Sequence, residues 1–279
     1  MKLLERLLSS ALVADDLKNQ LFAFLGGNAQ EFPALGGQNL TRVQAADLLC
    51  ELIPAEIQVR GICSLPVAAV AAAPHVSFDN WSEYFCNRIA RRLHIGWVVA
   101  KNFRDQHAAT IPVSIGRHIH VNRPTESDGP GRTEYESERA RAVHEQYLTA
   151  IREASGRASL PVDLLAEFHS HHRTPDLEIA TAGVNEELAA DLFQFYNSLR
   201  EKRPLLPAMK IAPLHELRLS ADAARKSGSI RTEVARVALH IEIPLEMRQS
   251  ESLRRLMLVS LRLTIDELLK QLQANPEIA

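Results

Sequence analysis

The chain has 279 residues, 46% of them hydrophobic, so it can bury a substantial core and is not expected to be disordered. Its 32 Lys and Arg residues against 34 Asp and Glu give a formal net charge of −2, which excludes a global field attracting nucleic acid or an anionic membrane. The three cysteines, an odd number without CxxC spacing, argue against a disulfide framework or thiolate zinc site and favour reduced thiols in a cytoplasmic protein.

The first 55 residues are expected to form an N-terminal helical extension. Leucine and alanine recur at helical spacing over residues 1–25, which predicts an amphipathic helix. A loop rich in glycine and proline follows between residues 26 and 37. Thr41 with Gln44 then resembles a capping box that opens a second helix through Leu52.

Residues 56–279 are expected to form an α/β domain. The longest uncharged apolar stretch in it, residues 65–74, is too short for a membrane span, which needs about 20 residues. Buried strands are predicted at 57–63 and 66–73, further strands at 96–100, 117–121, 162–169, 177–181 and 236–244, and helices at 81–94, 137–155, 185–202 and 248–273. This order predicts a mixed, largely parallel sheet with helices on both faces. Residues 122–132 read as a long functional loop.

Several common types of site lack their motifs in this chain. It contains no GxGxxG, no GxxxxGK[ST] and no GxSxG sequence. Dinucleotide binding, P-loop chemistry and a serine-hydrolase elbow therefore lack the glycine-dependent turns that they need. Histidine clusters remain as the candidates for chemistry.

The densest histidine cluster is His169-Ser170-His171-His172, directly after a predicted strand. Ligands bind at the carboxyl ends of strands in α/β sheets, so this position favours a metal site. Side chains alternate along a strand, which puts Asp163, Leu165, Glu167 and His169 on one face. Glu167 could then orient His169 as a metal ligand. The alternative is a polar surface loop.

A second candidate ligand, His75, follows another predicted buried strand, and Asp79 lies four residues further on. Together with the distant His169, they make the set of two histidines and one carboxylate that holds a catalytic zinc and leaves one position open for water. Glu83 is a rival ligand. However, Asn80 followed by Glu83 also fits a helix N-cap with its N3 partner, so Asp79 is preferred.

Glu242 is a carboxylate in an otherwise apolar predicted strand. Alternation points it to the same side as Ala238 and His240, and points Leu239 and Ile241 to the other side. Burial of a glutamate is unfavourable unless it meets a cation, a metal site or a hydrogen-bond donor. A raised pKa would suit a general base acting on water at a metal. The alternative is a solvent-facing residue on an edge strand.

Substrate-binding candidates lie in the middle of the chain. Arg123 could present its guanidinium to a carboxylate or a developing oxyanion, with Asn122 as its partner, although a surface arginine is the alternative. His118 and His120 form an H-x-H pair that ranks as a metal pair below His75 and His169. His144 lies on a predicted helix, either near the pocket or in solvent.

These motifs occur in an order that resembles the N-formylglutamate amidohydrolase family, which is similar in fold to zinc carboxypeptidases. The resemblance covers residues 57–273. It rests on Ala73-Pro74-His75, Val121-Asn122-Arg123-Pro124, His144-Glu145-Gln146-Tyr147-Leu148, Glu167-Phe168-His169-Ser170 with Pro175-Asp176-Leu177, and His240-Ile241-Glu242-Ile243. Residues 1–55 have no counterpart in it.

The resemblance implies that His75 and His169 bind the metal, Glu242 is catalytic, and Asn122 with Arg123 binds substrate. The chain departs from the family in three places. The usual Pro-His-Ser-Gly reads Pro74-His75-Val76-Ser77, the usual Asp-Leu-Asn-Arg reads His120-Val121-Asn122-Arg123, and the acid before His169 is glutamate rather than aspartate. These departures leave the carboxylate ligand and the acyl group open.

The leading hypothesis is therefore an amidohydrolase for a small anionic N-formyl or N-acyl amino acid. One zinc ion, held by His75, Asp79 and His169, would activate the water that attacks the amide, and Glu242 would take the proton of this water. Arg123, Asn122 and His144 are the expected substrate contacts. The alternatives are a carboxypeptidase-like enzyme, another N-acyl amino acid hydrolase, or a non-catalytic binding protein on the same fold. No nucleic-acid or membrane partner is expected, and a homo-oligomer stays open.

Overall fold

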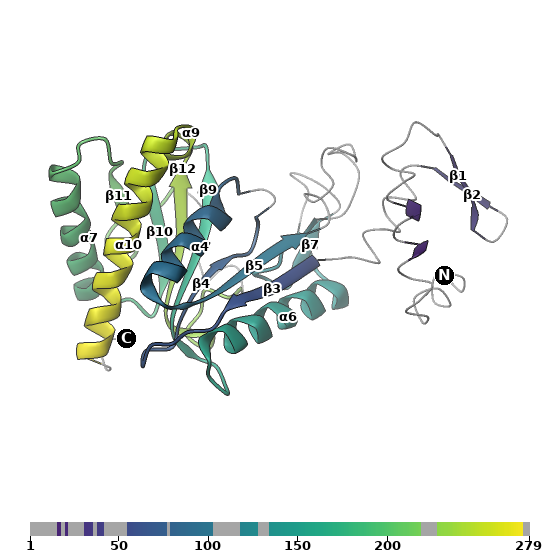
Figure 1. Ribbon diagram of the computed structural model, residues 1–279, viewed down its shortest axis with the longest axis horizontal. Helices are drawn as coiled ribbons and strands as arrows, with labels where there is room; N and C mark the ends of the chain where they lie inside the picture. The colour runs from purple at the N-terminus through teal and green to yellow at the C-terminus, as the bar shows by residue number, and fades with distance from the viewer. Residues whose placement is uncertain are drawn as a thin grey trace.

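The computed structural model describes residues 16–17, 20–21, 31–35, 38–41, 55–76, 79–102, 118–127, 134–218 and 228–275. Its centre is a seven-stranded sheet with the order β11-β10-β12-β9-β4-β5-β3 (Figure 1). The strands are β3 (Ala55–Gly61), β4 (Ala69–Ala73), β5 (Gly96–Asn102), β9 (Val162–His171), β10 (Leu177–Ala182), β11 (Met209–Ile211) and β12 (Ala235–Pro244). The helices are α4 (Ser82–Leu93), α6 (Glu138–Ser155), α7 (Glu186–Glu201), α9 (Glu246–Gln249) and α10 (Glu251–Ala274).

The four central strands of the sheet are parallel. β12 pairs in parallel with β9, β9 with β4, and β4 with β5. On the flanks, β10 is antiparallel to β12 and β3 is antiparallel to β5, whereas β11 is parallel to β10. The expected mixed, largely parallel sheet is therefore confirmed. Because β4, β9 and β12 run the same way, their carboxyl ends lie at one edge.

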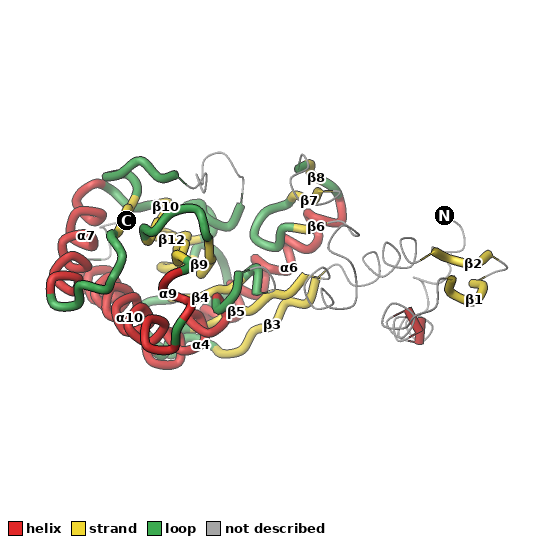
Figure 2. Tube along the Cα trace, turned by 90° about the horizontal axis from the view of Figure 1, so that it is seen from above, coloured by secondary structure: helices red, strands yellow, loops and turns green. Residues whose placement is uncertain are grey.

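Helices cover both faces of this sheet (Figure 2), as expected. α4, α7 and α10 pack on one face and α6 packs on the other, so the central strands contribute to two hydrophobic cores. On β9, Leu164 and Phe168 belong to the first core and Leu165 to the second. The same alternation directs Glu167 and His169 toward the α6 side, as the sequence predicts.

Local sequence explains where several elements begin. Ser137, Asn185 and Ser250 stand at the N-caps of α6, α7 and α10, and each side chain accepts a hydrogen bond from the backbone N–H three residues later. Gly96 opens β5 directly against the end of α6. A Cβ at Gly96 would come within 2.0 Å of the carbonyl oxygen of Ala154, so only glycine permits this close approach.

A small antiparallel sheet carries the middle segment of the chain. It consists of β6 (His118–Ile119), β7 (Thr125–Ser127) and β8 (Tyr135–Glu136). The strand expected at 117–121 is therefore short and lies outside the main sheet, and the expected loop 122–132 contains β7. The turn between β6 and β7 carries His120, Asn122 and Arg123.

The N-terminal extension departs from its expected all-helical form. β1 (Glu31–Leu35) and β2 (Gln38–Thr41) form an antiparallel pair where a loop was expected. A Gly-Gly dipeptide separates the two strands in the sequence, and a glycine pair between two short extended segments favours a hairpin over a loop. Residues 16–17 and 20–21 are helical, whereas the expected helix after Thr41 lies outside the described residues. The division of the chain at residue 55 stays a prediction.

The structure changes the expected form of one strand and one helix, and it decides between two alternatives for the histidine cluster. β3 is an edge strand and is half-exposed instead of buried, because it pairs only with β5. β9 extends through His171, so the histidine cluster begins inside a strand and is not a surface loop. The expected helix 248–273 is divided at Ser250 into α9 and α10. Within the described residues, no helix has the length and apolar character that a membrane span requires.

Candidate metal centre and active site

Three predicted site residues meet at the carboxyl edge of the parallel strands. His75 follows β4 by two residues, His169 lies near the end of β9, and Glu242 lies near the end of β12. Glu242 and His169 are direct partners in the β9–β12 register. Strand direction and register thus bring together side chains that are far apart in the sequence.

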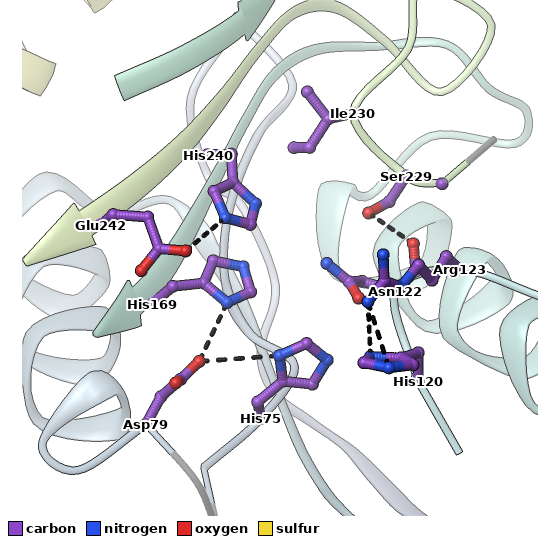
Figure 3. A pocket seen from close by; sticks show the side chains of 11 residues that line it. His75, Asp79, His120, Asn122, Arg123, His169, Ser229, Ile230, His240 and Glu242 are labelled. Carbon is purple, nitrogen blue, oxygen red and sulfur yellow. Dashed lines mark hydrogen bonds and ion pairs between the residues drawn. The ribbon is translucent and has the colours of Figure 1, made fainter. Parts of the chain in front are cut away.

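His75, Asp79 and His169 form a compact group of metal-ligand side chains (Figure 3). His169 Nδ1 donates to Asp79 Oδ2 at 2.9 Å, and His75 Nδ1 lies 3.6 Å from the same oxygen. Ligands about 2.0 Å from a tetrahedral zinc ion lie roughly 3.3 Å from one another. The distances of 2.9 and 3.6 Å are close to this spacing, and the donor atoms of all three residues lie within 4.8 Å of one another. Asp79, rather than Glu83, lies beside the histidines.

Burial and hydrogen bonds together set the pKa values of the three residues in this group. Burial opposes the ionisation of Asp79, but hydrogen bonds from His169 and His75 hold its pKa well below the usual range. Burial likewise opposes protonation of His169, but its hydrogen bonds to Asp79 and Glu167 raise its pKa to about 10. Burial lowers the pKa of His75. His75 is thus poised as a neutral ligand, and His169 holds a proton that a cation can replace.

Glu167 is fully buried beneath His169 and accepts hydrogen bonds from several segments of the chain. Its Oε1 accepts from Tyr147 at 2.8 Å and from Ser229, and its Oε2 accepts from Asn122 at 3.0 Å and from His169 Nε2 at 3.3 Å. Burial would raise its pKa, but the hydrogen bonds from His169 and His240 hold the pKa well below the usual value. Its oxygens are occupied, so Glu167 suits the predicted orienting role better than that of a ligand.

A second set of ligand-type groups, Glu167, His169 and His240, also lies close together. Because Glu167 already accepts four hydrogen bonds and does not line the cavity, this set is less suited to an ion than His75, Asp79 and His169. His240 stacks on His169, with ring centroids 3.8 Å apart and 17° between the ring planes. His240 therefore supports the group from the β12 side.

Glu242 lines the cavity beside this group, as the sequence predicts. Its Oε1 accepts a hydrogen bond from His240 Nε2 at 3.0 Å, whereas its Oε2 is buried and has no hydrogen bond within the described residues. The expectation of a raised pKa is wrong. Burial acts in that direction, but the hydrogen bond from His240 lowers the pKa of Glu242 overall. Glu242 is thus ionised, with one oxygen available to accept a proton.

The cavity has a volume of about 210 Å³. Figure 3 shows His75, Asp79, His169 and Glu242 on one side of it and His120, Asn122 and Arg123 on the other. The segment Gly228–Ile230 completes the wall. Ser229 N donates to the Asn122 carbonyl at 2.8 Å, and a Cβ at Gly228 would come within 2.6 Å of the same oxygen. Glycine is therefore required where this segment crosses the turn.

Arg123 lies in the cavity wall, but its guanidinium already has a partner. Its Nη2 donates to Glu134 Oε1 at 2.7 Å, and His120 Nε2 lies 3.2 Å from the same oxygen. Burial lowers the pKa of His120 to about 4, and the hydrogen bond from His120 lowers the pKa of Glu134 to about 2. Arg123 Nε is buried without a hydrogen bond in the described part of the chain. Arg123 thus keeps one donor for another ligand.

Two predicted residues do not take their expected places. His144 is buried on α6, contacts the Val121 carbonyl through Nδ1 at 3.2 Å, and does not line the cavity. It supports the turn instead of reaching a substrate, because the helix face that carries it packs beneath Val121. Asn80 does not cap α4, since Trp81 occupies the N-cap with φ 75°. Only the backbone of His118 is described.

A buried guanidinium connects the two segments that carry the ligands. Arg248, 6% exposed, donates to the His171 carbonyl at 2.7 Å and to the Asn80 carbonyl at 3.3 Å. These carbonyls follow His169 and Asp79 by two residues and one residue. Arg254 donates to the Arg248 carbonyl and stacks 3.8 Å over Trp81, whose left-handed backbone is unfavourable for a bulky residue. α9 and α10 thus hold the Asp79 turn in place.

Sequence reasoning did not find several residues of the site. Tyr147 was given no role of its own, although a buried tyrosine hydroxyl usually has a hydrogen-bond partner, which here is Glu167. Ser229, Glu134 and Arg248 carried no local signal, because their roles arise from contacts with distant segments.

No protein-family model and no curated protein sequence matches the chain. Solved structures are similar to it at low identity. A bacteriophage poly-gamma-glutamate hydrolase is 10% identical, covering 78% of this chain and 90% of that chain, with a TM-score of 0.44. A metallo-carboxypeptidase from Burkholderia cenocepacia is 12% identical, covering 78% of this chain and 67% of that chain, with a TM-score of 0.37. Murine aminoacylase 3 is 15% identical, covering 75% of this chain and 67% of that chain, with a TM-score of 0.39. At these values the likeness carries no argument about activity. Fold and site define a mixed α/β protein with a candidate metal centre.

Proposed function

We propose that the chain is a metal-dependent hydrolase that cleaves the amide bond of a small anionic N-formyl or N-acyl amino acid, with N-formylglutamate as the reference substrate. One observation carries the proposal. His75, Asp79 and His169 offer donor atoms within 4.8 Å of one another, in the wall of a cavity that also contains Glu242 and Arg123. Two imidazoles and one carboxylate are a ligand set typical of catalytic zinc.

The donor set fits a zinc ion held by His75, Asp79 and His169. The orientation of His169 by Glu167 matches the carboxylate–histidine arrangement common at zinc sites. A bound zinc ion would supply Lewis-acid polarisation of the scissile carbonyl and would acidify water. The remaining chemistry falls to residues of the chain.

Glu242 is the proposed general base. Its Oε2 accepts the proton of the attacking water and returns it to the leaving nitrogen, while His240 holds Oε1. Arg123 and Asn122, on the opposite wall, hold the carboxylate of the substrate or the developing oxyanion. Substrate binding at Arg123 involves either its buried Nε or exchange with Glu134.

The test combines metal analysis with an assay of formate release. Protein purified without chelator should contain about one zinc per chain, and His169→Ala should lose both the metal and the activity. Exposed His94, in the turn after α4, provides a matched control, because His94→Ala should retain both. Wild-type protein that stays metal-free after incubation with zinc would contradict the proposal and favour a binding protein.

A panel of N-formyl, N-acyl and peptide substrates then separates the hydrolase classes. Preference for N-formyl and N-acyl amino acids with a free carboxylate supports the proposed substrate class. Cleavage of peptides alone would contradict this substrate class while leaving the metal-dependent hydrolysis in place.

A further inference from the structure

A second depression lies away from the candidate active site, between α4 and α10. These two helices lie side by side on the sheet face opposite α6 (Figure 1). The depression has a volume of about 710 Å³ and is lined by Arg88, Arg91, Arg92, Leu258, Val259 and Arg262. We name these six residues the arginine groove. Four of the six carry a positive charge, although the whole chain has a formal net charge of −2.

The positive charge of the arginine groove is not neutralised within the described part of the chain. No acidic side chain lines the groove, and none of the ion pairs between described residues includes its arginines. Asp266, one helical turn beyond Arg262, pairs with Lys270 at 3.0 Å instead. Arg88, Arg91 and Arg92 are exposed to solvent. The groove therefore presents a local concentration of charge to the surroundings.

Helix stability does not account for this arrangement. A basic residue in the last turn favours a helix through its dipole, and α6 meets this need with the single residue Arg152. On α4, Arg88 lies three and four residues before Arg91 and Arg92, a spacing at which like charges destabilise a helix. Arg262 adds a fourth charge from another helix. The cluster thus opposes local stability, as expected of a binding surface.

The chemistry of the groove favours acidic peptide over nucleic acid. Its floor is aliphatic, with Val259 38% exposed beside Leu258. Among the described residues, no aromatic ring lines the groove, and the nearby ring of Tyr84 is covered by the Arg88 guanidinium, which lies 4.9 Å from the ring centroid. Single-stranded nucleic acids rely on aromatic stacking, whereas arginine forks match carboxylates and an aliphatic floor accepts aliphatic side chains.

We propose that the arginine groove binds an acidic peptide segment of a partner protein. Carboxylates of the peptide contact Arg88, Arg91, Arg92 and Arg262, and an aliphatic side chain of the peptide packs on Leu258 and Val259. This interaction surface is independent of the proposed hydrolase activity, because it is formed by α4 and α10, and no residue of these two helices lines the cavity at the carboxyl edge of the strands.

The test uses a short fluorescein-labelled peptide in which Glu and Asp flank one Leu-Val pair. Fluorescence anisotropy should show binding to the full chain that weakens with salt. The double variant Arg91→Glu with Arg92→Glu should weaken binding at least about tenfold, and Arg262→Glu should weaken it from the other helix. Arg152→Glu, which changes an exposed arginine in the last turn of α6, should bind as wild type does.

Three outcomes would overturn the proposal. The first is that the wild-type chain does not bind the peptide. The second is that the Arg91/Arg92 double variant and Arg262→Glu bind the peptide as well as Arg152→Glu does. The third is that polyuridylate binds the groove with higher affinity than the peptide does, which would identify the groove as a nucleic-acid site. Thermal unfolding of each variant separates loss of binding from loss of folding. An acidic residue in the last turn opposes the helix dipole, so the Arg91/Arg92 double variant and Arg152→Glu should both unfold at a slightly lower temperature and remain folded in the binding assay.

Discussion

Glu242 has one carboxylate oxygen fixed by His240 and the other buried without a hydrogen bond among the described residues. Glu242→Gln keeps the shape of the side chain but removes the basic oxygen. We expect turnover to fall about 10²- to 10⁴-fold with zinc content unchanged, because the residue moves a proton and holds no metal. Steady-state kinetics and metal analysis of the same sample check this. Full activity, or parallel loss of zinc, would contradict the role.

His169 gives the site a definite dependence on pH. Its hydrogen bonds to Asp79 and Glu167 outweigh burial and raise its pKa to about 10, so the metal-free protein holds a proton there at neutral pH. Zinc must displace this proton, and its apparent affinity should rise about tenfold per pH unit between neutrality and the pKa. Calorimetry in buffers of different ionisation enthalpy should detect about one proton released. A pH-independent affinity would contradict this account.

Arg248 acts on the ligands through the backbone that carries them. Arg248→Met removes the two hydrogen bonds that tie His171 and Asn80 together but keeps an apolar side chain of similar length. We expect zinc to bind about 10- to 100-fold more weakly, as for other residues that orient ligands. Arg255→Met, at an exposed position of α10, is the control. Equal zinc affinity in both variants, measured by competition with a chelator, would contradict the positioning role.

At the scale of elements, the segment Gly228–Ile230 shows how a backbone contact shapes the cavity. Gly228→Ala would push a methyl group against the Asn122 carbonyl, which lies 2.6 Å from the Cβ position. We expect destabilisation of about 1–3 kcal/mol and weaker substrate binding, because Ser229 would move from Asn122. Thermal unfolding and KM measure the two effects. An unchanged melting temperature together with an unchanged KM would contradict this prediction and show that the segment accommodates the methyl group.

Long elements with a clear period can be predicted from the sequence. β9 spans residues 162–171 against an expected 162–169, and α6 spans 138–155 against 137–155. Each has enough turns or alternations for its buried face to stand out. β11 and β7, with three residues each, have too few positions for a period and depend on pairing with other strands of the folded chain.

In the candidate site, too, features with a local sequence pattern could be predicted, whereas those that depend on contacts in the folded chain could not. His75, His169 and Glu242 could be identified because chemistry-bearing side chains at strand ends are visible in the sequence. Alternation also places His240 beside Glu242, but the sequence does not show that the hydrogen bond from His240 outweighs burial and lowers the pKa of Glu242. Arg248 bonds to a carbonyl 168 residues away, at Asn80, and no local pattern encodes such a contact.

At the scale of the whole molecule, β4, β9 and β12 each place alternate side chains in the two opposite cores. Neither layer of helices can therefore separate without uncovering strands that the other layer also needs. We expect a single cooperative unfolding transition, in which the backbone amides of these three strands exchange with deuterium only through global opening. Hydrogen-exchange mass spectrometry measures this, and faster exchange in β9 than in α6 would contradict it. His169 on β9, and the turn after β4 that carries His75 and Asp79, should therefore keep their relative positions until the whole sheet opens.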